Sequence, residues 1–142
     1  MKAERRVYRD DFISKYAKLN EYIKDLEWRV NALEKKNYYL ALTYKSHRST
    51  LDTCEIILKN FDKMDKYSKK VITFKKCLSR AYPLSAKTLI DYFDKFKNVK
   101  IISAKLGITP CTFYKKLNKT CEHVINKYEF EIKRGGDYYS FL

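Results

Sequence analysis

Seven lysines and no acidic residue lie between positions 95 and 121, where the residue types are best suited to chemistry. Lysine ammonium groups bind phosphate oxygens, and lysine and asparagine can also donate hydrogen bonds to the edges of bases. The segment therefore predicts the binding of a polyanion. The alternative is that the lysines cover an ordinary solvated helix face. The lysines are Lys95, Lys97, Lys100, Lys105, Lys115, Lys116 and Lys119.

The element that positions these side chains is expected to begin with a short helix. Val99, Ile102 and Leu106 are three and four residues apart, so they share one helix face. Gly107 is typical of a helix end, because glycine tolerates the left-handed backbone found there. Ile108 is then expected to fill the turn that follows.

A second helix begins directly after this turn. Thr109 can cap it with its hydroxyl group, and Pro110 suits the first helical position. Phe113 and Leu117, four residues apart, would face back onto the first helix. Ser103 stands where the two helices cross closely and where alanine is usual. The pattern predicts a helix-turn-helix, which places its second helix in the major groove of DNA.

The outward positions of this motif divide into two predicted roles. The residues best placed for base edges are Thr109, Cys111, Tyr114, Lys115 and Asn118. Those better placed for phosphates are Lys97, Lys100, Lys105, Thr112, Lys116 and Lys119.

The segment from Leu84 to Ile125 resembles region four of bacterial sigma factors, most closely the small phage and mobile-element regulators built on that region. The resemblance covers 42 of the 142 residues. It implies a preceding helix from Ser85 to about Phe96 and a recognition helix from Pro110 to about Asn126. It also implies promoter or operator DNA as the ligand and RNA polymerase as a further partner. The sigma region that reads the −10 element has no counterpart in this sequence.

Composition places the positive charge at the same end of the chain as this motif. The formal net charge is +14, of which residues 1–61 contribute +4 and residues 62–142 contribute +10. Only three glycines and two prolines interrupt the sequence, which predicts an all-α protein. A basic domain of this kind points to nucleic acid, with an affinity that falls steeply with salt.

Several function classes are disfavoured by the same sequence. The two histidines lie in separate segments, and there is no phosphate-cradling glycine loop, so we expect neither an enzyme nor a cofactor. The charged N-terminus has no apolar run behind it, so we expect a cytoplasmic, nucleoid-associated protein without a membrane span. The scattered cysteines predict neither disulfides nor a metal site. They are Cys54, Cys77, Cys111 and Cys121.

A heptad pattern runs from Phe12 to Tyr44, with isoleucine and valine at a positions and leucine at d positions. This pattern favours a parallel two-stranded coiled coil, in which Asn37 at an a position would fix the register. We therefore expect a homodimer, with one face of an intramolecular bundle as the alternative. The predicted interface residues are Leu19, Ile23, Leu26, Val30, Leu33, Asn37 and Leu40.

The sequence thus predicts four segments: a coiled-coil helix over 1–61, a connecting amphipathic helix over 62–83, a helix-turn-helix domain over 84–128 and a tail over 129–142. In the tail, Tyr128–Ile132 alternates like a strand but has no partner strand. The predicted function is a dimeric, sequence-specific regulator of transcription. The alternatives are a DNA-binding protein for packaging, maintenance or replication, and a basic coiled-coil scaffold that binds RNA or an anionic membrane.

Overall fold

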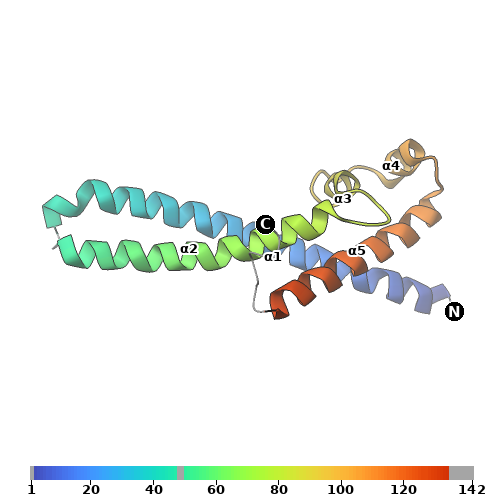
Figure 1. Cartoon of the computed structure of the whole chain (residues 1–142). Coiled ribbons are helices and arrows are strands. Elements are labelled where there is room, and N and C mark those ends of the chain that lie inside the picture. The colour runs from blue at the N-terminus through green and yellow to red at the C-terminus, as the bar shows by residue number, and fades with distance from the viewer. Residues whose placement is uncertain (1, 48–49, 135–142) are drawn as a thin grey trace. The chain divides into compact units, whose positions relative to one another are not determined.

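The predicted all-α class is confirmed, because the described residues, 2–47 and 50–134 of this computed structural model, form five helices and no strand. Side chains are described for residues 12–43 and 51–134. In chain order the helices are α1 (Lys2–His47), α2 (Thr50–Ser79), α3 (Ala86–Phe93), α4 (Val99–Leu106) and α5 (Pro110–Lys133) (Figure 1).

The chain divides into two compact units. We call Tyr22–Ile72 the hairpin unit, and Met1–Glu21 together with Thr73–Leu142 the head unit. The expected boundary after residue 61 differs from this division, because residue 61 lies inside α2. No glycine or proline interrupts the sequence of α2, so one helix replaces the end of the expected coil and most of the connecting helix.

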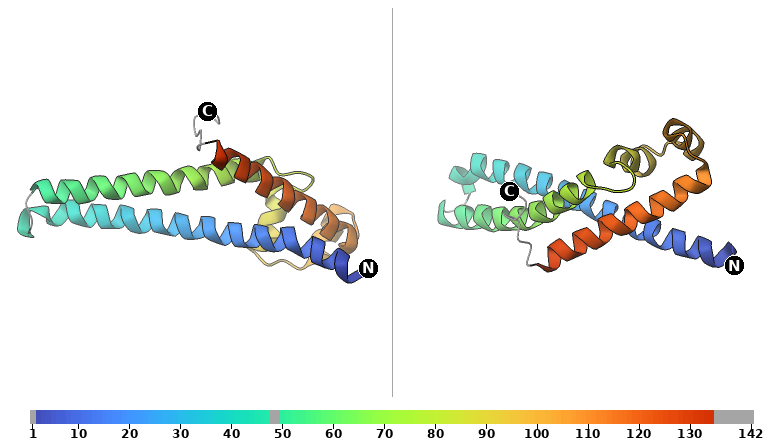
Figure 2. Two further views of the ribbon diagram at one scale, coloured as in Figure 1. Left: turned by 90° about the horizontal axis from the view of Figure 1, so that it is seen from below. Right: turned by 45° about the vertical axis from the view of Figure 1, so that its right-hand side comes forward.

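The hairpin unit consists of the parts of α1 and α2 that run antiparallel, side by side (Figure 2). Ile23 and Leu26 of α1 are buried. The buried Nδ2 of Asn60 donates a hydrogen bond to Oδ1 of Asn37 at 2.8 Å. Nδ2 of Asn37 donates to the carbonyl oxygen of Ile57 at 3.4 Å. The heptad face of α1 is therefore covered by α2 of the same chain.

This packing differs from the expected parallel coil and is the intramolecular alternative. Ile23, Leu26 and Asn37 are buried, and the neighbouring Val30 and Leu33 are half-buried, within one copy of the chain. Leu40 is also half-buried, as is Leu19, which belongs to the head unit. The physical reason is that α2 presents a seven-residue repeat of its own to α1, in which Thr53 and Asn60 are buried.

The head unit has an aromatic core that joins four helices, α1, α2, α3 and α5. The Tyr16 ring of α1 lies 4.6 Å from the ring of Phe93 and 5.9 Å from that of Phe74, between centroids. The Phe74 ring in turn lies 6.1 Å from that of Tyr128 on α5. Rings at these separations attract one another beyond the burial of their area. Burial also raises the pKa of the Tyr16 hydroxyl well above its usual value.

Two helix boundaries in the head unit differ from the expected ones. Ser85 caps α3 by accepting a 3.2 Å hydrogen bond from the Thr88 N–H, and α3 then ends at Phe93, before Phe96. The helix α5 continues to Lys133 instead of stopping near Asn126. The alternating segment 128–132 is therefore helical, while the rest of the expected tail, from residue 135 onward, lies outside the described residues.

Candidate nucleic-acid interface

The end of α4 is closed by two hydrogen bonds around a glycine. Gly107 has a φ of 70°, in the left-handed region, and its N–H donates to the carbonyl of Ala104 at 3.1 Å. The next N–H, of Ile108, donates to the carbonyl of Ser103 at 3.0 Å. This pair of bonds is the Schellman arrangement, which reverses the chain within two residues. A Cβ at position 107 would meet nothing within 4 Å, so only the backbone conformation requires glycine.

The start of α5 is fixed as sharply as the end of α4. Thr109 Oγ1 accepts a 3.2 Å hydrogen bond from the N–H of Thr112, and Pro110 occupies the first turn. The Thr109 hydroxyl also donates to Thr112 Oγ1 at 3.0 Å. Three residues therefore separate two capped helices, with the orientation of α5 set by local hydrogen bonds.

Burial holds α4 and α5 together behind this turn. Phe113 and Leu117 on α5 are fully buried, and Ile102 and Ser103 on α4 are buried as well. The small Ser103 side chain, whose hydroxyl donates to the carbonyl of Lys100 at 3.3 Å, occupies the buried face as the sequence predicts. Leu106 differs from the expectation, because its side chain is 42% exposed and does not complete the apolar face.

The predicted base-contact residues separate into two groups. Thr109, Cys111 and Lys115 are exposed, whereas Tyr114 and Asn118 are half-buried. The Tyr114 ring makes edge contacts with other rings of the head unit, including that of Tyr92 at 6.5 Å. The Asn118 Oδ1 atom is buried and has no hydrogen-bond partner among the described residues. Only the first group is placed to reach a ligand without rearrangement.

The residues predicted to contact phosphates also differ in their exposure to solvent. Lys100, Lys105 and Lys119 are exposed, and Lys116 and Thr112 are half-buried. Four of these residues therefore extend a positive surface from α4 onto α5, since only Thr112 is uncharged.

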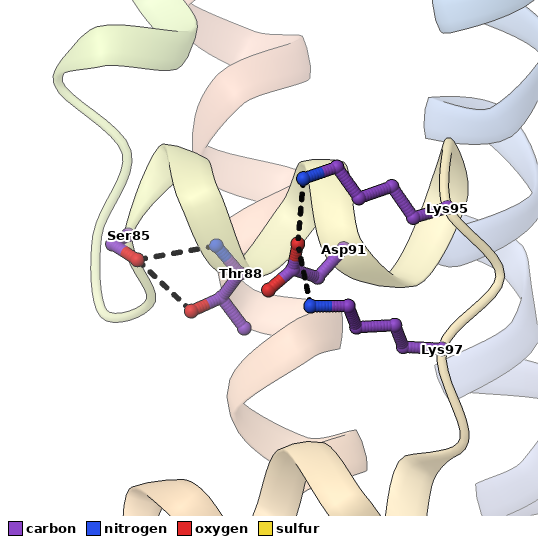
Figure 3. A network of polar contacts seen from close by, with 5 residues as sticks. All are labelled: Ser85, Thr88, Asp91, Lys95 and Lys97. Atoms are coloured by element: carbon purple, nitrogen blue, oxygen red, sulfur yellow. Dashed lines mark hydrogen bonds and ion pairs between the residues drawn. The ribbon is translucent and has the colours of Figure 1, made fainter.

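One acidic residue on α3 neutralises part of the positive charge near this surface. Nζ of Lys97 lies 3.6 Å from Oδ1 of Asp91, and Nζ of Lys95 lies 3.7 Å from the same oxygen (Figure 3). The same close view shows Thr88, about one turn before Asp91 on α3, and Ser85, which caps the helix from the preceding loop. Sequence reasoning missed Asp91, although its spacing of four residues from Lys95 was a usable signal for a helical ion pair.

A groove of about 890 Å³ runs beside the half of α5 that follows the lysine segment. Exposed Tyr82 and Phe130 line it together with Lys119, His123 and Lys127. Aromatic rings next to cations are suited to unstacked bases or to a phosphate backbone. Sequence reasoning missed the groove because it ended the recognition helix at Asn126 and because Tyr82 comes from a distant segment.

The cysteines provide no metal site in the part of the chain that the structure describes, where no three His, Cys, Asp or Glu side chains gather around one point. Cys54 and Cys111 are exposed, whereas Cys77 and Cys121 are buried. Burial raises the pKa of the Cys77 thiol to about 11 and that of Cys121 to about 12. The two buried thiols are therefore protonated packing groups at neutral pH.

Comparison with family models, with curated protein sequences and with solved structures gave no match to this chain. Among the described helices, none contains an apolar stretch that could span a lipid bilayer. The features of the chain that bear on its function are therefore the geometry and charge around α4 and α5.

Proposed function

We propose that α4 and α5 form a helix-turn-helix that binds duplex DNA, and that the protein regulates transcription at the sites it binds. The observation that supports this most strongly is the surface at the start of α5. There, exposed Lys115 and Lys119 follow a capped helix N-terminus along the first half of α5, in a segment without acidic residues. The helix dipole attracts phosphate oxygens at the first turn, and the lysine charges attract them along the following turns.

The helix α5 is long enough for its two halves to have different roles. With 24 residues the helix is about 36 Å long, roughly three times the width of the major groove. Its second half is anchored by Cys121, Val124 and Ile125, which are buried in the head unit. The first half of α5 is then the recognition segment. Its angle to the head unit is fixed because the second half of the same helix is buried in the core.

The exposed side chains of the first half suit direct contacts with bases. Lys115 can donate to O6 and N7 of guanine, and the hydroxyl of Thr109 can reach either a base or the backbone. Lys100 and Lys105 on α4 would bind phosphates beside the groove and fix the register of α5. A protein acting in this way works with the nucleoid in the cytoplasm, and RNA polymerase is the partner that a transcription regulator would contact.

The test is selection from a library of random duplexes by the full chain, followed by titration of the enriched duplex and of a scrambled duplex at physiological salt. We expect the enriched duplex to bind at least tenfold more tightly. Lys115→Ala should reduce that preference, while Lys63→Ala, an exposed lysine of the hairpin unit, serves as the matched control.

Three outcomes would contradict the proposal in whole or in part. Failure to enrich any duplex would remove sequence-specific recognition. Equal binding of duplex DNA, RNA and anionic vesicles would favour the basic scaffold instead. An enriched site that gives neither activation nor repression of a reporter gene would favour packaging, maintenance or replication over regulation.

A further inference from the structure

The hairpin unit leaves an unusual number of large apolar side chains in contact with water. On α1, Tyr38 is 68% and Leu42 is 64% exposed, and on α2, Leu51, Leu58 and Phe61 are between 52% and 70% exposed. Single exposed apolar residues are common on protein surfaces, but a contiguous group marks a surface for interaction.

A shallow cleft identifies one side of the hairpin, because it is lined from both helices, by Asn31 of α1 and Ser68 of α2 among others. Residues seven apart on a helix point within about 20° of the same direction. Tyr38 lies seven residues after Asn31, and Phe61 lies seven residues before Ser68. Tyr38 and Phe61 therefore project from the cleft side, one from each helix.

The remaining members of the group are placed by helical spacings of three, four and seven residues. Leu42 lies four residues beyond Tyr38, and Leu58 lies three residues before Phe61. Cys54, which is exposed, lies seven residues before Phe61 and thus on the same side. Leu51 lies seven residues before Leu58 and extends the group along α2. We call Tyr38, Leu42, Leu51, Cys54, Leu58 and Phe61 the hairpin patch.

The opposite side of the hairpin has a different chemistry. There, Nζ of Lys70 donates a 3.1 Å hydrogen bond to the hydroxyl of Tyr22, so a polar bridge joins the two helices. Arg29 likewise bonds to Tyr67 across the helices, and it forms a 2.9 Å ion pair with Asp25. One side of the hairpin is therefore closed by polar bridges, and the other carries the hairpin patch.

We propose that the hairpin patch binds the same patch of a second copy of this chain. The patch suits a protein surface because its five large side chains expose roughly 600 Å² of apolar area, close to the roughly 800 Å² per partner of a stable interface. Pairing around a two-fold axis would turn two hairpins into a four-helix arrangement that buries both patches.

Charge favours a second copy over the other occupants. The chain carries +14, yet residues 34–62, which contain the patch, carry only +1. This segment is therefore where two copies repel each other least. DNA or an anionic membrane would instead be drawn to the basic segments of the chain. The contact does not depend on the proposed function and can be tested without DNA.

The test is the molecular mass of the full chain in solution at micromolar concentrations. We expect twice 17.1 kDa for the wild type and a single 17.1 kDa chain for Leu58→Glu, with the dimer dissociation constant raised at least tenfold. Lys63→Gln is the matched control, because it makes the same change in net charge as Leu58→Glu, while Lys63 is exposed and lies seven residues before Lys70, on the side of the polar bridges. Equal helical circular dichroism of the two variants would show that each is folded.

Two natural thiols provide an independent readout. Cys54 lies in the hairpin patch and Cys111 lies on α5, and both are exposed in a single chain. Pairing should slow alkylation of Cys54 as protein concentration rises, while the rate at Cys111 stays constant. A wild type that is monomeric throughout this range, a dimer disrupted equally by Lys63→Gln, or an alkylation rate at Cys54 independent of concentration would overturn the proposal.

Discussion

Asn37 and Asn60 form a buried hydrogen bond of 2.8 Å that joins α1 to α2. In a coiled coil, an asparagine at this heptad position selects register and oligomer state, at a cost in stability. Here the partner asparagine comes from the same chain, so the bond fixes the register of an antiparallel hairpin. It leaves the choice of oligomer to other surfaces.

The pair predicts a specific pattern of stability. Asn60→Leu should destabilise the protein by about 1–3 kcal/mol, because the Oδ1 atom of Asn37 would lose its donor in a buried place. The double variant Asn37→Leu/Asn60→Leu should recover most of that loss, since no polar group remains unpaired between the helices. Urea unfolding of the wild type, both single variants and the double variant measures the coupling. Strictly additive losses would show that the two side chains act independently.

Two lysines of the proposed interface should give different defects. Lys115→Ala should cost about 1–3 kcal/mol on the selected duplex and little on a scrambled one, because Lys115 is placed for base edges. Lys105→Ala should weaken both duplexes by a similar factor and reduce the salt slope by about one unit, because it is placed for phosphates. Fluorescence anisotropy on both duplexes over a range of salt measures the two effects. Equal losses from the two variants would refute the division of roles.

Asp91 should act as a brake on DNA binding. Its carboxylate holds Lys95 and Lys97 at 3.7 Å and 3.6 Å, so Asp91→Asn should release both ammonium groups for phosphates. We expect affinity for any duplex to rise by a factor of about two to ten, with a steeper dependence on salt. Asp65→Asn in the hairpin unit makes the same change in net charge and serves as the control. A rise of the same size in both variants would indicate a general charge effect.

The buried thiols predict a loss of stability in alkali. Burial raises the pKa of Cys77 to about 11 and that of Cys121 to about 12, so both are neutral in the folded chain at pH 9 to 10. An unfolded thiol already ionises near pH 8.5, which favours the unfolded state as the pH rises further. The free energy of unfolding should therefore be constant below about pH 8 and fall between about pH 9 and 12. The variant Cys77→Ala/Cys121→Ala should be less stable at neutral pH but show a flatter profile in chemical denaturation.

The features that the sequence predicted well depend on neighbours along the chain. Gly107, Thr109 and Pro110 define the turn through bonds that span three to five residues, so their types alone were informative. The contact roles assigned to Lys115, Lys105 and the other lysines remain predictions.

The features that were missed depend on what a helix packs against. Heptad spacing identifies the apolar face of α1 but not the element that covers it, and α2 covers it in the hairpin unit. Likewise, α5 continues past Asn126 because Tyr128 and Glu131 are buried in the head unit. Neither partner is visible in a local pattern.

Because α5 runs without a break from its exposed lysines into the core around Val124, the proposed binding of DNA and the thermal stability of the head unit would depend on the same helix. A bound duplex would raise the melting temperature of the head unit through mass action. In the other direction, heat that loosens the core would weaken the proposed binding of DNA. The temperature range in which DNA stays bound would therefore depend on the packing of Val124 and Ile125, away from the proposed DNA-binding surface.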